Sequence, residues 1–145
     1  MPSYIVVARH AERLDYDMRD NKGQNWTSTA ARPFDTPVTA HGLEQGTKLG
    51  RHLRQALEKR GLPPITAVYA SPLLRCRQTA AQASRELPNI DIVYVEDGLV
   101  ESIQTAWYRS WGLPGSDGTW NYHMMKNERT LSWHEMALRP VQELL

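Results

Sequence analysis

Short hydrophobic runs alternate with amphipathic stretches along the first two-thirds of the chain. Residues 4–8 ("YIVVA"), 65–70 ("ITAVYA") and 91–95 ("DIVYV") are rich in β-branched side chains and do not alternate with polar residues. Such runs are typical of strands that are covered on both faces of a sheet. The pattern therefore predicts three buried strands.

Two amphipathic stretches separate these predicted strands. In residues 40–61, leucines recur at roughly helical spacing, Thr39 can cap the start and Gly61 can end the helix. Residues 71–87 begin with Ser-Pro, in which Ser71 can act as the cap and the proline can occupy the first helical position. We therefore predict a helix in each stretch.

Three further segments do not follow this alternation. Residues 14–36 are polar and have few periodic hydrophobic positions, so we predict a long loop there. Residues 102–130 contain glycine, proline, polar residues and tryptophans, and a last helix is predicted from Ser132, where "SWHE" has capping-box spacing. The order strand, helix, strand, helix, strand indicates one layered α/β domain over residues 1–145, with a mostly parallel sheet.

Composition and charge narrow the function classes. The 145 residues are 41% hydrophobic and 23% charged with a net charge of +1, which favours an ordinary globular domain and gives no support for a nucleic-acid or membrane partner. The lone cysteine, Cys76, excludes an internal disulfide and a multi-cysteine zinc site. With no signal peptide and no long apolar run, we expect a cytoplasmic protein.

Ionisable residues follow each predicted strand. "ARHAER", "SPLLR" and "DGLVE" come after the first, second and third strands and contribute Arg9, His10, Arg13, Arg75 and Glu101. In open α/β sheets, ligands bind beyond the carboxyl ends of the strands, so we expect these side chains to meet there. Three arginines with little acid between them suit a phosphate or carboxylate ligand.

Four ordered motifs resemble those of a known family. "RHAER", "TPVTAHGLEQG", "SPLLRCRQTA" and "GLVE" together resemble the histidine phosphatase superfamily, also called phosphoglycerate mutase-like. The long polar insert and the "DTPVT" spelling most resemble the branch of the suppressor-of-T-cell-receptor-signalling and ecdysteroid-phosphate phosphatases. The resemblance implies a three-layer αβα sandwich.

The resemblance also implies roles for individual residues. His10 matches the nucleophile that becomes phosphohistidine, and Glu101 matches the proton donor; Arg9, Arg13 and Arg75 match the arginines that bind the phosphoryl oxygens. A neutral imidazole and fixed cations suit that chemistry. It implies no cofactor and no metal, and a phosphorylated small molecule or phosphoprotein as substrate; a homodimer is left open.

Two departures from the family pattern stand out. Ala11 occupies a position where the family usually has glycine, which is harmless if its φ is negative. The family also has a second catalytic histidine after a late strand, and no histidine here has that context. Since "LSWHEMALRPVQELL" resembles the helix before that strand, we expect a C-terminally incomplete domain that lacks its last strand, second histidine and closing helix.

Three functions are therefore weighed. A phosphate-monoester hydrolase acting through His10 is favoured. A phosphoglycerate mutase shares the fold and nucleophile, but the long insert at 14–36 speaks against it. A non-catalytic phosphate- or protein-binding module is the third, and the missing second histidine is its best support. The sequence does not choose among substrates.

Overall fold

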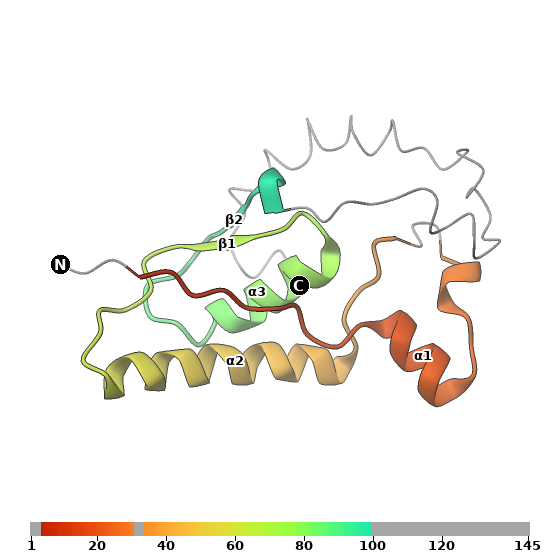
Figure 1. The fold of residues 1–145 in the computed structure, drawn as a ribbon, viewed down its shortest axis with the longest axis horizontal. Helices are drawn as coiled ribbons and strands as arrows, with labels where there is room; N and C mark the ends of the chain where they lie inside the picture. The colour runs from red at the N-terminus through yellow and green to blue at the C-terminus, as the bar shows by residue number, and fades with distance from the viewer. Residues whose placement is uncertain (1–3, 31–33, 100–145) are drawn as a thin grey trace.

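Helices and a parallel strand pair make up the part of the chain that the computed structural model describes, residues 4–30 and 34–99. In chain order the elements are α1 (Leu14–Lys22), η1 (Trp26–Ser28), α2 (Ala40–Lys59), β1 (Val68–Ala70), α3 (Leu74–Ser84), β2 (Val93–Val95) and η2 (Asp97–Leu99) (Figure 1). The irregular stretch and the last helix predicted after residue 102 lie outside these ranges.

The two strands pair as the sequence predicts. β1 runs parallel to β2 with Val68 opposite Val93 and Tyr69 opposite Tyr94, and the two tyrosine rings stack with centroids 5.3 Å apart. Both strands are shorter than the hydrophobic runs that predicted them. The α/β class with a parallel sheet is confirmed.

α3 lies between α2 and the strands (Figure 1) and contacts both. Ala81 of α3, Ala70 of β1 and Val93 of β2 form a buried hydrophobic cluster, in which Ala81 and Val93 are fully buried. These small side chains allow the helix to lie close against the strands. A short turn connects the carboxyl end of β1, at Ala70, to the start of α3, at Leu74.

The ends of α2 are those that the sequence predicts. The Thr39 side chain accepts a hydrogen bond from the Gly42 N–H, and Gly61 takes the left-handed backbone (φ 61°) just after the helix. The buried face of α2 differs from the prediction, because glycines rather than leucines make most of it. A Cβ at Gly50 would lie 2.1 Å from the Ala83 carbonyl oxygen, so the glycine lets α2 and α3 pack closely.

The predicted first strand is not formed. Residues 4–8 have no strand assignment, and the sheet of the described residues contains only β1 and β2, paired with each other. Ile5 and Val7 are 91% and 90% exposed. A hydrophobic run favours burial but does not by itself provide a partner for its backbone N–H and C=O groups, and the prediction was wrong for this part of the chain.

The predicted loop at 14–36 contains a helix instead. α1 has acidic residues in its first turn, basic residues in its last turn and the left-handed Gly23 (φ 62°) at its end. Asp17 also pairs with Lys22 at 2.8 Å. Charges that suit the helix dipole and a glycine stop stabilise this helix, and a search for hydrophobic periodicity does not detect them.

The start of α3 is also displaced from the prediction. The helix begins at Leu74, three residues beyond Ser71, and its N-cap residue, Leu73, makes no side-chain cap. Asp35 Oδ1 accepts the Leu74 N–H at 2.6 Å and so caps the helix, whereas Ser71 Oγ accepts the Leu73 N–H, ahead of the helix, at 3.5 Å. No helix within residues 4–30 and 34–99 is long and apolar enough to cross a membrane.

Candidate active site

His10 is held against α3 by the residue that follows it. The Ala11 N–H donates to Thr79 Oγ1 at 3.0 Å, and the same hydroxyl donates to the Arg75 carbonyl at 2.7 Å. Thr79 is 6% exposed. One buried hydroxyl therefore connects the backbone beside His10 to the turn of α3 that carries Arg75.

The ring of His10 is oriented by the backbone of the next residue. Nδ1 lies 2.8 Å from the Ala11 carbonyl oxygen. A carbonyl can only accept a hydrogen bond, so Nδ1 carries the hydrogen. In the neutral ring the lone pair then belongs to Nε2, which is the nitrogen able to act as a nucleophile.

The surroundings of His10 favour that neutral ring. Burial lowers its pKa, the hydrogen bond to the Ala11 carbonyl raises it, and the positive charges of Arg75, Arg13 and Arg9 lower it again. The net result is a pKa below the ordinary value of 6.5. All three predicted phosphate-binding arginines thus act electrostatically on His10.

Arg75 is buried at the start of α3. It is 1% exposed, and its Nη1 donates to the Phe34 carbonyl oxygen at 3.3 Å. The neighbouring Asp35 is the residue that accepts the Leu74 N–H. The short segment before α2 therefore fixes both the start of α3 and the direction of the Arg75 side chain.

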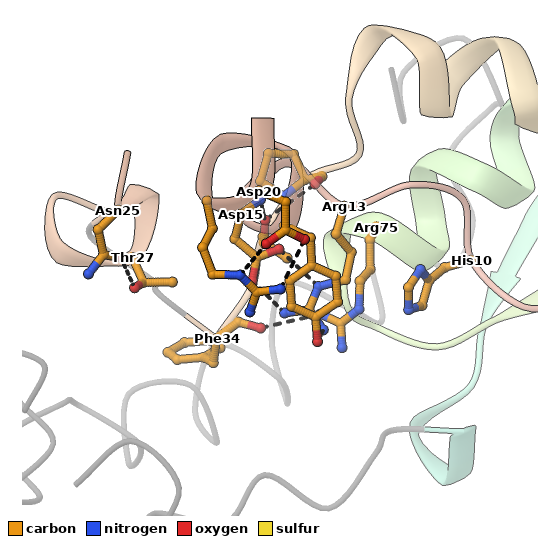
Figure 2. A network of polar contacts seen from close by, with 12 residues as sticks. His10, Arg13, Asp15, Asp20, Asn25, Thr27, Phe34 and Arg75 are labelled. Carbon is orange, nitrogen blue, oxygen red and sulfur yellow. Dashed lines mark hydrogen bonds and ion pairs between the residues drawn. The ribbon is translucent and has the colours of Figure 1, made fainter. Parts of the chain in front are cut away.

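Arg13 is fixed by a carboxylate and an aromatic ring. Its Nε and Nη2 donate to the two carboxylate oxygens of Asp15 at 3.0 and 2.7 Å, and its guanidinium lies 4.3 Å from the centroid of the Tyr16 ring. In the view of Figure 2, Arg13 and Arg75 lie next to each other and His10 lies beyond Arg75. Two cations and the imidazole therefore gather from segments far apart in the sequence.

The remaining predicted residues differ in their position. Arg9 is exposed, although its charge still lowers the pKa of His10. Glu101, the predicted proton donor, lies outside the described residues. The structure thus brings His10, Arg13 and Arg75 together and leaves the role of Glu101 a prediction.

Ala11 fits the backbone that the family usually builds with glycine. Among the non-glycine residues in the described ranges, only Asn89 has a positive φ. Ala11 therefore has a backbone that any residue adopts. The first departure from the family pattern carries no strain at this position.

A cavity lies beside Arg13 and does not include His10 or Arg75 in its lining. It has a volume of about 400 Å³ between α1 and η1, and its lining includes Asp15, Tyr16 and Arg19. Within the described parts of the chain, no three His, Cys, Asp or Glu side chains lie together as metal ligands would.

Three contributors to the site were not predicted from the sequence. The sequence assigned no site role to Asp15, which pairs with Arg13, and none to Thr79 or Asp35. Asp15 follows Arg13 by two residues, and Asp35 belongs to the "DTPVT" motif, so both had a weak sequence signal. Thr79 belongs to the "SPLLRCRQTA" motif and lies one turn after Arg75, so its signal was equally weak.

Comparison with protein families decides the relationship. The model of the histidine phosphatase superfamily (branch 1) matches residues 5–109, well over half of the chain. The chain belongs to the histidine phosphatase superfamily. The four motifs that suggested this family from the sequence lie within the matched range.

Two individual proteins show low sequence identity to this chain. A protein of Acanthamoeba polyphaga mimivirus, called an uncharacterized phosphoglycerate mutase family protein R708, is 31% identical over 90 residues, which cover 61% of this chain and 40% of the viral protein. The crystal structure of the ecdysone phosphate phosphatase of Bombyx mori in complex with tungstate is 22% identical and matches with a TM-score of 0.45. That match covers 72% of this chain and 51% of the insect chain, so the chain spans about half or less of either relative.

Proposed function

We propose that this protein hydrolyses phosphate monoesters through a covalent phosphohistidine on His10, without a metal ion. The observation that carries the proposal is the state of the His10 ring. Its Nδ1 is engaged by the Ala11 carbonyl, and burial and the three neighbouring arginines lower its pKa. A neutral imidazole with Nε2 as its nucleophilic atom is what attack on phosphorus requires.

The first step forms the covalent intermediate. His10 Nε2 attacks the phosphorus, the new P–N bond forms and the bond from phosphorus to the ester oxygen breaks. Arg9, Arg13 and Arg75 bind the oxygens of the transferring phosphoryl group, where fixed cations stabilise the transition state. Glu101 donates a proton to the departing oxygen, so that the alcohol leaves as a neutral molecule.

The second step regenerates the enzyme. Glu101, now a carboxylate, takes a proton from a water molecule as the water oxygen attacks the phosphorus. The P–N bond breaks, its electron pair returns to His10 Nε2, and inorganic phosphate leaves. The nucleophile is His10 in the first step and water in the second, Glu101 gives and then regains the proton, and no atom changes its oxidation state.

The test separates the nucleophile from the proton donor. 2,4-Dinitrophenyl phosphate needs no acid to release its leaving group, so it should label His10 whatever the state of Glu101. We expect a phosphoryl label that is stable in alkali, labile in acid and absent from His10→Ala. His52→Ala is the matched control, since His52 lies exposed on α2, and it should be labelled as the parent chain is.

Further measurements distinguish the alternatives. Glu101→Gln should slow turnover of an alkyl phosphate far more than turnover of the dinitrophenyl ester. EDTA should leave both activities unchanged. Appreciable conversion of 3-phosphoglycerate would favour the mutase, whereas vanadate binding without any label on His10 would favour a non-catalytic phosphate-binding module.

A further inference from the structure

The contacts of Asp15 indicate a role in phosphate binding, and this inference rests on the proposed function. We propose that Asp15 is a positioning residue, which holds the guanidinium of Arg13 in the direction that binds the transferred phosphoryl group. It reaches phosphate only through Arg13. The pair joins the end of the N-terminal segment to the first turn of α1.

The geometry fixes the arginine in two directions. Both oxygens of the Asp15 carboxylate accept from one edge of the guanidinium, at 3.0 and 2.7 Å, and such a paired contact sets the plane of the group. The Tyr16 ring lies against the guanidinium, 4.3 Å from centroid to Cζ, and the Tyr16 hydroxyl accepts from Nη1 at 3.3 Å. An arginine otherwise has many rotamers, and these contacts select among them.

The backbone that carries the Asp15 carboxylate is itself held in place. Asp15 is 7% exposed, and its backbone N–H donates to the hydroxyl of Thr36, which is fully buried. The side chain of Arg13 is 17% exposed. An ion pair this well shielded from water resists screening by salt, unlike the surface pair of Arg19 and Asp20 on the same helix.

Two effects of Asp15 on a bound anion oppose each other. Its negative charge repels the anion, so removing the charge alone would tighten binding. Its hold on Arg13 favours binding, because a displaced ligand group can cost up to about a hundredfold in the reaction. Positioning outweighs repulsion if removal of the Asp15 charge weakens anion binding, and repulsion outweighs positioning if that removal tightens it.

The experiment measures orthovanadate affinity by isothermal titration together with turnover of 2,4-dinitrophenyl phosphate. Asp15→Asn should raise the vanadate Kd and the KM by about tenfold, with a smaller change in kcat. Asp17→Asn is the matched control, because it removes an equal charge from the same first turn of α1. It should leave both constants within about twofold.

A double-mutant cycle tests the route through Arg13. In an Arg13→Ala background, Asp15→Asn should have little further effect on vanadate affinity, whereas an effect equal to that in the parent chain would make Asp15 merely structural and overturn the proposal. Unchanged or tighter binding in Asp15→Asn alone would also overturn it. If Asp15→Asn does not fold, Asp15→Glu keeps the charge but moves it, and the same comparison applies.

These outcomes separate the inference from the proposed function. If the parent chain labels His10 but Asp15→Asn matches Asp17→Asn, the phosphatase remains and the positioning role falls. If the parent chain neither binds vanadate nor becomes labelled, both fall together.

Discussion

Replacing Thr79 by valine should damage stability and chemistry at once. The hydroxyl accepts from the Ala11 N–H and donates to the Arg75 carbonyl. Valine has nearly the same shape but can do neither. The Arg75 carbonyl keeps its place in the α3 hydrogen-bond ladder, so the main cost falls on the Ala11 N–H, which loses its acceptor beside His10.

The magnitude follows from that lost acceptor. A shielded N–H without a partner costs about 1–3 kcal/mol. For a small domain that loses about 1–3 kcal/mol of stability per molar urea, the midpoint of urea unfolding should fall by roughly 1 M. His10 should also be held less firmly, so the rate of labelling by 2,4-dinitrophenyl phosphate should fall severalfold even without urea.

Two companion variants make the result specific. Thr47→Val removes a hydroxyl from α2 that donates to Leu43 and Gln82 and accepts no backbone N–H among the described hydrogen bonds, so its effect should stay within about 0.5 kcal/mol. Thr79→Ser keeps the hydroxyl and should retain the labelling rate. Equal losses in Thr79→Val and Thr47→Val, or normal labelling of Thr79→Val, would show that the Thr79 hydroxyl does not hold the backbone beside His10.

Two other predictions concern pH and helix packing. Because the pKa of folded His10 lies below 6.5, the unfolded chain binds more protons as the pH falls from 6.5 toward that lower pKa. Stability from this group is therefore fully present above pH 6.5 and declines below it; urea unfolding of His10→Asn should show a weaker decline, and equal pH dependence in both would contradict this. Gly50→Ala should lower the free energy of unfolding by about 1–3 kcal/mol, since its Cβ would meet the Ala83 backbone, whereas exposed Lys48→Ala should change it by under about 0.5 kcal/mol in the same titration.

Local chemistry explains what the sequence predicted well. The limits of α2 follow from Thr39 and Gly61, whose effects depend on neighbours in the chain. The parallel pairing of β1 and β2 follows from two hydrophobic runs separated by a helix. The motifs that carry His10, Arg13 and Arg75 are visible in the sequence, but residues 4–8 form no strand that would deliver His10 to a sheet edge. The hydrogen bond from the Ala11 N–H to Thr79 of α3 connects the two segments instead.

Contacts between distant segments explain what it missed. Asp35 caps α3 from 39 residues away, whereas Ser71, which the sequence offers as the cap, accepts the Leu73 N–H one residue ahead of the helix. Glycines make much of the buried face of α2, where they let neighbouring segments approach the helix closely. A hydrophobicity pattern does not detect such a face. The predicted strand at 4–8 failed because a hydrophobic run does not specify a hydrogen-bonding partner.

Covalent labelling tests most directly whether His10 is the nucleophile. The chain is incubated with 2,4-dinitrophenyl [32P]phosphate, quenched in alkali, digested and analysed by mass spectrometry. We expect one acid-labile phosphoryl group on the peptide that contains His10, present in His52→Ala and absent from His10→Ala. A label that persists in His10→Ala, or the absence of any label on the parent chain, would show that His10 is not the nucleophile.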